Sequence, residues 1–327
     1  MKNSTPQFTR RTALTVSLGL LTQAPAWSQA YPARPVRILV GYAAGGAVDA
    51  IARTIGQALN ATLKQTFVIE NKPGAGSNIA IKATIEAPAD GYTLLMAANA
   101  LPANMALFQP KPFDAERDLT PVALIGRVPV VIAANVNAPY STIKELITAA
   151  KAKPGHISFA SPGNGATPHL AVEFFKRAAG ISLLHIPYRG GAPAITDVIG
   201  GQLPLVAVNA LEVLPHVKSG KLKVIAVLST SRSPIFPETP TIAESGFPGF
   251  EASVWYGLMA PFATPKNIVE QLHAEVQKAL QTPEVRQKMT QVGGELAPGN
   301  IDMFAKLISS ERIRYEKLIR EANIKPD

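Results

Sequence analysis

The sequence contains no cysteine among its 327 residues. This absence excludes disulfide bonds, thiolate catalysis and cysteine-based metal sites, so the hydrophobic core must supply the stability of the fold. Histidine is also scarce. Its five residues (156, 169, 185, 216 and 273) lack the spacing of metal ligands, and the metalloprotease motif His-Glu-x-x-His does not occur. We therefore expect neither a bound metal nor a cofactor.

Long runs of apolar or basic residues are absent as well. No stretch approaches the ~18 consecutive apolar residues that a transmembrane helix needs. The formal net charge is +9, from 32 Lys and Arg against 23 Asp and Glu, but the basic residues are scattered. This distribution does not indicate a nucleic-acid surface, whereas the positive balance modestly favours anionic ligands.

Three motifs for nucleotide binding or catalysis are incomplete. Gly41 and Gly46 have the spacing of a P-loop, but Ala47 and Val48 replace its Lys and Ser/Thr. The segment 41–43 breaks a dinucleotide-binding Gly-x-Gly-x-x-Gly. Residues 159–163 come nearest to the serine-hydrolase motif Gly-x-Ser-x-Gly but lack its first glycine. Spacing leaves open a triad assembled in space, yet no motif supports catalysis.

The N-terminal segment 1–30 has the pattern of an export signal. Lys2, Arg10 and Arg11 precede an apolar segment (13–21), and a run of mostly small residues (24–30) follows. The start of this pattern also resembles a twin-arginine signal. We expect cleavage near Ala30 and a periplasmic location. The remaining chain of roughly 300 residues suits two domains.

The stretch 36–49 predicts an anion-binding site. Residues 36–40 predict a buried strand, Gly45 and Gly46 form a loop, and apolar residues at helical spacing from Val48 to Leu59 predict a helix. The unpaired N–H groups and the dipole at the start of such a helix attract an anion. Without the phosphate motifs, a carboxylate is the anion that remains. The alternative is a glycine turn that binds nothing.

A second loop, residues 161–169, has the same pattern. It follows a predicted strand and opens a predicted helix, with Thr167 suited to the N-cap and Pro168 to the first helical position. Its N–H groups, with the Ser161 and Thr167 hydroxyls, would form another anion pocket. If the two loops belong to facing domains, they would hold one ligand from both sides.

Strands and helices alternate along the whole chain, with short glycine-rich loops between them. This alternation predicts an α/β fold with parallel, doubly wound sheets and a ligand beyond the carboxyl ends of the strands. The apolar run 128–134 would carry the chain into a second domain, and segment 255–257 would return it. We therefore predict one domain from residues 31–132 plus 258–327, with the C-terminal helices packed on it, and another from residues 133–257.

Several short segments occur together in a specific order and spacing. They include Glu-Asn-Lys-Pro-Gly-Ala-Gly (70–76), Asp-Gly-Tyr-Thr-Leu-Leu (90–95), Ser-x-Gly-Asn-Gly (161–165), His-Ile-Pro-Tyr-Arg-Gly (185–190) and Pro-Thr-Ile-Ala-Glu-Ser-Gly (240–246). With them the chain resembles the Bug (TctC-like) family, the periplasmic solute receptors of tripartite tricarboxylate transporters. The resemblance implies a periplasmic-binding-protein-like fold with a ligand cleft between two domains. It also implies a non-catalytic monomer that binds a small organic carboxylate and delivers it to membrane transporter subunits.

The resemblance further implies that the carboxylate is held between the two loops. The predicted ligand-binding residues are Tyr42, Gly45, Gly46, Asn78, Ser161, Gly163, Asn164, Gly165, Thr167, His169, Tyr188 and Asn209. His169 could instead face solvent, and Tyr188 could pack beneath its loop. Asp49 is expected to brace its helix rather than contact ligand, and Trp255 and Tyr256 to belong to the hinge core.

Departures from the family pattern bear on the ligand. Val208 stands where an acidic residue often precedes the asparagine, and such an acid can meet the ammonium of an amino acid. Residues 101–103 are apolar where the family often has a polar residue, and Ala44 and Val48 replace a proline and a threonine of the first loop. These features favour a di- or tricarboxylate or an aromatic acid over an amino acid. A periplasmic sensor that reports to a signalling partner and a hydrolase with a spatially assembled site remain the alternatives.

Overall fold

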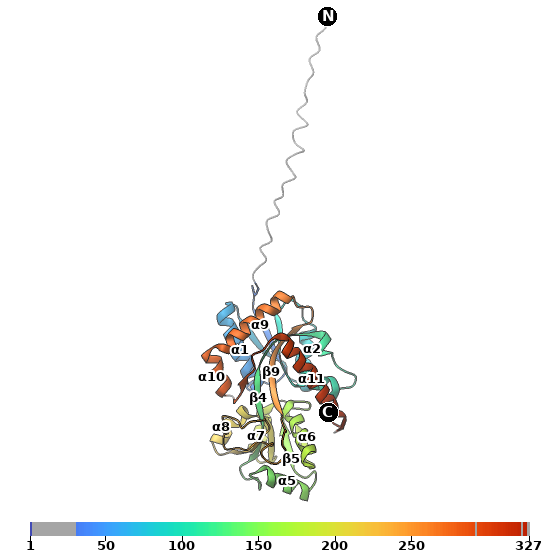
Figure 1. The fold of residues 1–327 in the computed structure, drawn as a ribbon, viewed down its shortest axis with the longest axis vertical. Coiled ribbons are helices and arrows are strands. Elements are labelled where there is room, and N and C mark those ends of the chain that lie inside the picture. Colours follow the sequence, from blue (N-terminus) through green and yellow to red (C-terminus); the bar gives the residue numbers. More distant parts are fainter. Residues whose placement is uncertain (2–30, 292, 322, 326–327) are drawn as a thin grey trace.

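The structure is a computed structural model that describes residues 1, 31–291, 293–321 and 323–325. The predicted export signal, apart from Met1, lies outside the described residues. The described chain forms two lobes placed end to end, with strands β4 (Leu119–Asn135) and β9 (Ser253–Pro261) at their junction (Figure 1). The two-domain α/β architecture predicted from the alternation of strands and helices is thus present.

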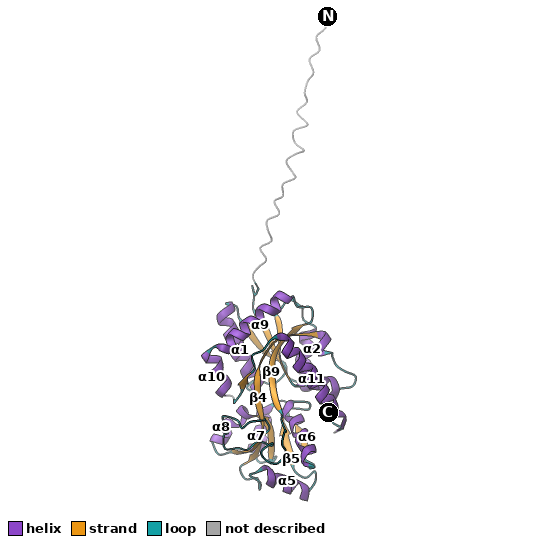
Figure 2. Ribbon diagram, in the orientation of Figure 1, coloured by secondary structure: helices purple, strands orange, loops and turns teal. Residues whose placement is uncertain are grey.

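The first lobe contains a mixed sheet in the order β2-β1-β3-β9-β4, with β10 beside β4. Strands β1 (Val36–Val40), β2 (Phe67–Asn71) and β3 (Thr93–Ala98) are parallel, whereas β9 is antiparallel to β3 and β4, and β10 (Glu295–Leu296) is antiparallel to β4. Helices surround this sheet (Figure 2): α1 (Ala47–Leu63), η1 (Ala75–Ser77), α2 (Asn78–Ile85), α3 (Ala100–Leu107), α4 (Ala115–Asp118), α9 (Lys266–Gln281), α10 (Pro283–Gln291) and α11 (Ile301–Glu321).

The second lobe contains a sheet in which β4 lies between β8 and β7, followed by β5 and β6. Strands β5, β6 and β7 are parallel, and β4 is antiparallel to both β7 and β8. The elements of this lobe are α5 (Ile143–Ala152), β5 (Ser158–Ser161), α6 (Thr167–Ala179), β6 (Leu184–Pro187), α7 (Gly191–Ile199), β7 (Leu205–Asn209), α8 (Ala210–Lys218) and β8 (Leu222–Val227).

The prediction of wholly parallel sheets is therefore wrong. Each lobe has three parallel strands joined by helical crossovers, as the alternation indicates. The linking strands differ because each enters the sheet of the other lobe in the opposite direction. Strand β9 runs antiparallel to β3 and β4 in the first lobe, and β4 runs antiparallel to β7 and β8 in the second. Strand β4 changes sheet between Pro129, which pairs with Ser253, and Val130, which pairs with Asn209. The predicted boundaries at 132/133 and 257/258 lie inside β4 and β9.

Helix starts depend on local sequence. The predicted apolar face of α1 is buried, with Ile55 and Leu59 fully so. Helix α6 begins at Thr167 with Pro168 beside it, but its N-cap is Ala166 rather than the predicted Thr167. The hydroxyl of Thr167 therefore belongs to the first helical turn.

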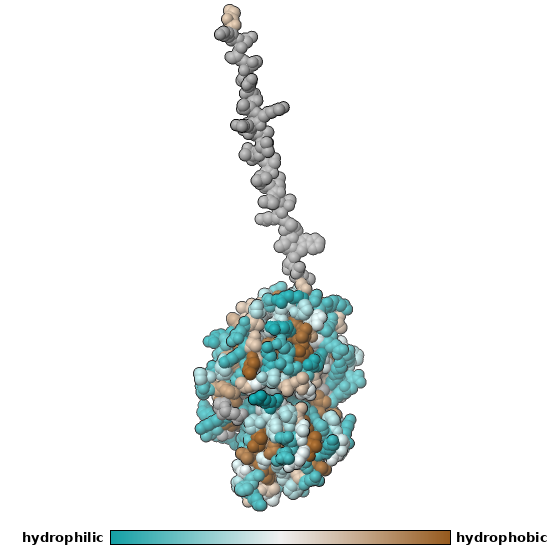
Figure 3. Space-filling view, turned by 180° about the vertical axis from the view of Figure 1, so that it is seen from behind, coloured by the Kyte–Doolittle hydropathy of each residue, from teal (hydrophilic) through white to brown (hydrophobic). Residues whose placement is uncertain are grey.

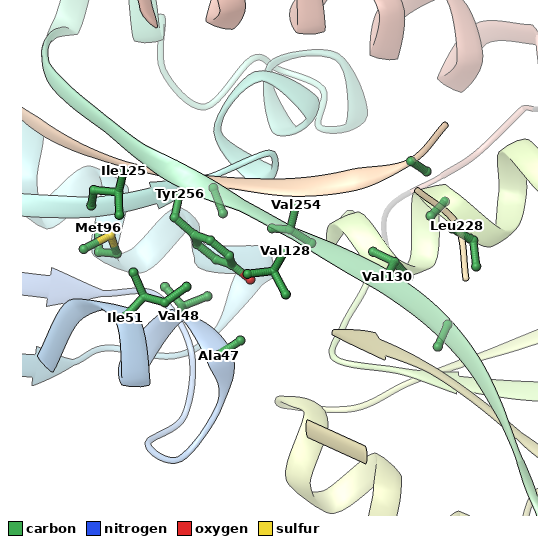
Figure 4. Close-up of a cluster of buried hydrophobic side chains, with 14 of the residues drawn as sticks. Ala47, Val48, Ile51, Met96, Ile125, Val128, Val130, Leu228, Val254 and Tyr256 are labelled. Atoms are coloured by element: carbon green, nitrogen blue, oxygen red, sulfur yellow. The ribbon is translucent and has the colours of Figure 1, made fainter. Parts of the chain in front are cut away.

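The hydrophobic core is continuous between the lobes along β4 and β9. Val128 and Val254 lie on the first-lobe side of the junction, and Val130 and Leu228 continue the cluster into the second lobe (Figure 4). The junction is thus a packed hinge rather than an open linker.

Helix α11 contacts both lobes, which the sequence did not predict. It packs along α3 in the first lobe, where the Asn99 side chain donates a hydrogen bond of 3.0 Å to the Tyr315 hydroxyl. Its C-terminal part reaches α6 in the second lobe, where Arg177 pairs with Glu321 at 2.9 Å. The predicted packing of the C-terminal helices on the first domain is therefore incomplete.

The face of the molecule in Figure 3 is mainly polar, and apolar side chains form small separate groups on both lobes there. None of the helices in the described residues is long and apolar enough to cross a membrane.

Candidate functional site

Four helices begin at the junction of the lobes. Each follows the carboxyl end of a parallel strand: α1 follows β1, and α6, α7 and α8 follow β5, β6 and β7. Residues at all four N-termini line one cavity of about 40 Å³ between the lobes, among them Gly46, Thr167, Gly191 and Asn209. Helix N-termini carry unpaired N–H groups and a partial positive charge. Their convergence makes this cavity an anion-binding position.

The N-cap residues of these four helices do not cap their own helices through side chains. Within the described chain, the caps Gly46, Ala166, Gly190 and Asn209 make no side-chain capping hydrogen bond. Helix α5 has a reciprocal capping box of Thr142 and Glu145, whereas the N-caps of α2, α3 and α9 also make no side-chain capping bond. The four ends at the junction are therefore distinguished by their position around one cavity, where a ligand can accept from their N–H groups.

In the first loop, Gly45 donates its N–H group to a side chain of the protein, whereas Gly46 lies at the cavity. The Gly45 N–H donates to Asp49 at 3.1 Å, and the same carboxylate accepts from Arg53 at 2.9 Å and from Asn71 at 3.0 Å. Burial opposes the charge on Asp49, but these hydrogen bonds outweigh it and lower its pKa. Asp49 thus braces the loop, as expected. Gly45 does not line the cavity, whereas Gly46 does.

The second loop is held by two histidines, of which His169 is buried and His185 is half-buried. The Ser161 hydroxyl lies 2.7 Å from Nε2 of His185, and the Gly165 N–H donates to Nδ1 of His169 at 3.2 Å. The two imidazole rings stack with centroids 3.8 Å apart. Burial, with a smaller contribution from Lys176, lowers the pKa of His185 to about 4, and burial also lowers the pKa of His169. Both rings are therefore neutral at pH 7.

This pairing of serine and histidine does not form a hydrolase site. Ser161 is 0% exposed, and its hydroxyl also accepts a hydrogen bond from the Gly163 N–H at 3.2 Å. A nucleophile must reach its substrate, and the Ser161 hydroxyl instead faces the interior of its own loop. Ser161 and His169 therefore position the loop rather than line the cavity.

A wider groove of about 640 Å³ continues outward from the cavity and shares Tyr42, Pro162 and Ala166 with it. Gly163, Asn164 and Tyr188 line this groove. The Asn164 side chain donates to the Lys325 carbonyl at 3.0 Å, and the Tyr188 hydroxyl donates to Asp197 at 2.6 Å. Both side chains are thus fixed at the rim.

The structure separates the predicted site residues into three groups. Tyr42, Gly46, Thr167 and Asn209 line the inner cavity. Gly163, Asn164 and Tyr188 line the outer groove, which Tyr42 lines as well. Gly45, Asn78, Ser161, Gly165 and His169 line neither in the described structure. Asn78 accepts a hydrogen bond from the side chain of Asn104 at 2.7 Å, so it is part of the support beneath the first lobe's loops.

Two side chains of the inner cavity were not among the predicted site residues. Tyr256 belongs to the hinge core, as expected, and it also projects from β9 toward the first turn of α1 and lines the cavity (Figure 4). Its hydroxyl is buried and has no hydrogen-bond partner among the described residues. Glu212, in the first turn of α8, also lines the cavity and accepts a hydrogen bond from the Asn209 side chain at 2.8 Å. In the sequence it is indistinguishable from an acid that stabilises its own helix dipole.

The N-terminus of α7 was also missed, although a signal existed. Gly190 and Gly191 follow a strand and open a helix, which is the pattern that identified the other two loops. The expected apolar wall at residues 101–103 is not found at the cavity; these residues are buried in α3, and Ala98 lines the cavity instead. The absence of an acid at Val208 therefore does not exclude an amino group in the ligand, because Glu212 supplies an acid from another position.

Comparison with known proteins shows the family of this chain. The family model described as "Tripartite tricarboxylate transporter family receptor" (TctC) matches residues 51–324. The protein BugT of Bordetella pertussis is 36% identical over 304 residues, which cover 92% of this chain and 93% of BugT.

Two solved structures from Rhodopseudomonas palustris are similar over their whole length. Rpa4515 with adipate has a TM-score of 0.87 and 32% identity, and the match covers 91% of this chain and 100% of that one. MatC with bound malate has a TM-score of 0.83 and 30% identity, with 88% of this chain and 100% of that one covered. The chain therefore belongs to the TctC family of tripartite tricarboxylate transporter receptors, periplasmic solute-binding proteins of the Bug type that bind carboxylates.

Proposed function

We propose that this chain is an exported, non-catalytic receptor that captures one small organic carboxylate in the cavity between its lobes and delivers it to the membrane subunits of a tripartite tricarboxylate transporter. The convergence of four uncapped helix N-termini on one cavity carries the proposal. A carboxylate there accepts N–H bonds without needing a cationic side chain, because the helix termini supply the positive field.

The cavity's lining supports a particular division of roles. Gly46 and Thr167 would bind the carboxylate from opposite lobes, and the unpartnered Tyr256 hydroxyl would donate a further hydrogen bond. Residues of the outer groove would contact the distal part of the ligand. The inner cavity is narrow, with a volume of about 40 Å³. The lobes would therefore move apart for entry and close around the ligand, with β4 and β9 as hinges.

Malate and adipate bound to the similar structures make short dicarboxylates the first candidates for this chain. We further propose that the export signal is cleaved near Ala30 and that the receptor acts as a periplasmic monomer.

A thermal-shift screen of the chain from residue 31 onward tests the function. The panel contains malate, adipate, citrate, benzoate and the corresponding neutral amides. A ligand at about 100 times its Kd adds about 2.7 kcal/mol to the stability of the native state, so binding is visible as a raised melting temperature. We expect a shift with one class of carboxylate and none with the amides. Shifts with the amides but with no acid would refute an anion site at the helix N-termini.

A further inference from the structure

Among the described residues, Glu212 is the one acidic or basic side chain in the lining of the inner cavity. It reaches from α8 of the second lobe to α1 of the first. One carboxyl oxygen accepts from the Asn209 side chain at 2.8 Å, and the Ala47 N–H at the start of α1 also hydrogen-bonds to the carboxyl group. The other oxygen packs directly on Gly191, where a Cβ atom would have no room. The carboxyl group therefore lies where the N-termini of α1, α7 and α8 meet.

This position is the one that a ligand carboxylate would seek. The uncapped N–H groups and helix dipoles that attract the ligand surround Glu212 as well. Two carboxylates at one site cannot both stay ionised without strong repulsion, and such pairs share a proton instead.

The groups that face Glu212 include no base. From the first lobe, the neutral hydroxyls of Tyr42 and Tyr256 face it, and the charged residues of the first turns of α1, Asp49 and Arg53, pair with each other. From the second lobe, α7 presents only small residues, Gly191 and Ala192, and α6 presents Thr167.

Other charges of the second lobe lie elsewhere. Asp197 of α7 is bonded to Tyr188, and Arg189 lines the outer groove rather than the inner cavity. Burial without a nearby cation raises the pKa of Glu212, although hydrogen bonds from Asn209 and Ala47 oppose this rise.

We propose that Glu212 takes up a proton when the ligand binds. The neutral carboxyl group then donates a hydrogen bond to the ligand carboxylate, so one proton from solvent enters the site with each captured anion. This inference rests on the proposed function and adds a residue and a proton to it. It makes Glu212 the residue that sets the pH dependence of capture.

Calorimetry of malate and adipate binding tests the inference. Titrations at pH 8 in two buffers with different ionisation enthalpies count the protons taken up per ligand. For the wild-type protein we expect nearly one proton per ligand and an affinity that falls about tenfold per pH unit above the pKa of Glu212. The variant Glu212→Gln keeps the shape and an acceptor oxygen for Asn209 but cannot ionise. We expect it to take up no proton and to bind with little pH dependence.

Two results would overturn the inference. One is the absence of proton uptake in the wild type, or equal uptake in Glu212→Gln. The other concerns aspartate, which differs from malate by an ammonium group in place of a hydroxyl. If aspartate binds more tightly than malate without proton uptake, and Glu212→Gln abolishes that preference, then Glu212 is an ionised partner for a ligand cation.

Urea unfolding of the ligand-free proteins separates this inference from the proposed function. If no acid binds to either protein, the proposed function fails. The raised pKa of Glu212 is then tested only by how the free energy of unfolding depends on pH. Because its pKa is raised in the native state, the stability of the wild type relative to Glu212→Gln should decline as the pH rises above the unfolded pKa of a glutamate, about 4.3. A difference that does not change with pH would contradict a raised pKa of Glu212 in the ligand-free protein, and with it the proton uptake that is inferred for the bound state.

Discussion

Replacing Gly46 with proline tests whether the start of α1 holds the anion. Gly46 is the N-cap of α1, with φ −80° and ψ 171°, which is close to the φ of about −65° that a proline ring imposes. Proline can therefore adopt the native backbone, but it removes one N–H donor from the cavity wall. In a compatible position, proline also stabilises the fold by about 0.4–1 kcal/mol, because it restricts the unfolded chain.

The expected loss of affinity follows from the bond that is removed. A hydrogen bond to a charged group contributes about 1.5–3 kcal/mol, which corresponds to a roughly 10- to 150-fold weaker Kd. Gly46→Ala is the matched control. Its Cβ atom would lie 3.8 Å from the Ala43 carbonyl oxygen and 4.0 Å from a carboxyl oxygen of Glu212, which are ordinary contacts. It keeps the N–H group and should bind nearly as the wild type does.

Titration calorimetry with the best carboxylate from the screen measures the affinity, and urea unfolding measures the stability. We expect Gly46→Pro to lose at least tenfold in affinity at undiminished stability. Equal affinity of the proline and alanine variants would refute the assignment of this N–H group to the ligand. Gly165→Pro is not an equivalent test. Gly165 has φ +73°, which proline cannot adopt, and its N–H supports the loop through His169.

Two further substitutions address the cavity and its support. Tyr256→Phe removes a buried hydroxyl that has no partner among the described residues. We expect carboxylate binding to weaken about tenfold, and the free energy of unfolding to stay unchanged or to rise by about 1 kcal/mol. Unaltered affinity in calorimetry would show that the hydroxyl does not contact the ligand. The pKa of His185 is about 4 in the native state and about 6.5 in an unfolded chain, so the unfolded state binds its proton first as the pH falls. The free energy of unfolding should therefore fall by up to about 3 kcal/mol between pH 6.5 and pH 4. In urea unfolding, the variant His185→Gln should not show this fall. The same fall in the variant would assign the pH dependence to other groups.

Much of the fold was predictable because its signals are local. The apolar run 36–40 and the helical spacing from Val48 to Leu59 correctly indicated β1 and the buried face of α1. The family resemblance, carried by short segments in order, is confirmed by the family model. The antiparallel pairing of β4 and β9 was not predictable, because it depends on which strands meet after the chain has crossed between lobes.

The site was only partly predictable for a related reason. A glycine between a strand and a helix indicates that N–H groups are available, but it does not say what accepts them. In the structure, Asp49 takes the Gly45 N–H and His169 takes that of Gly165, whereas Gly46 remains at the cavity. These competing acceptors come from the next helical turn, and their orientation depends on tertiary packing.

The alternating elements, the glycine loops that open α1 and α6, and the absence of thiol and cysteine-based metal chemistry can all be read from the chain. They follow from composition and from periodicities that act over a few residues. Which groups share the cavity depends on how distant elements pack together. Tyr256 and Glu212 reach it from β9 and α8 because two lobes fold against each other along β4 and β9, and no local pattern records that meeting.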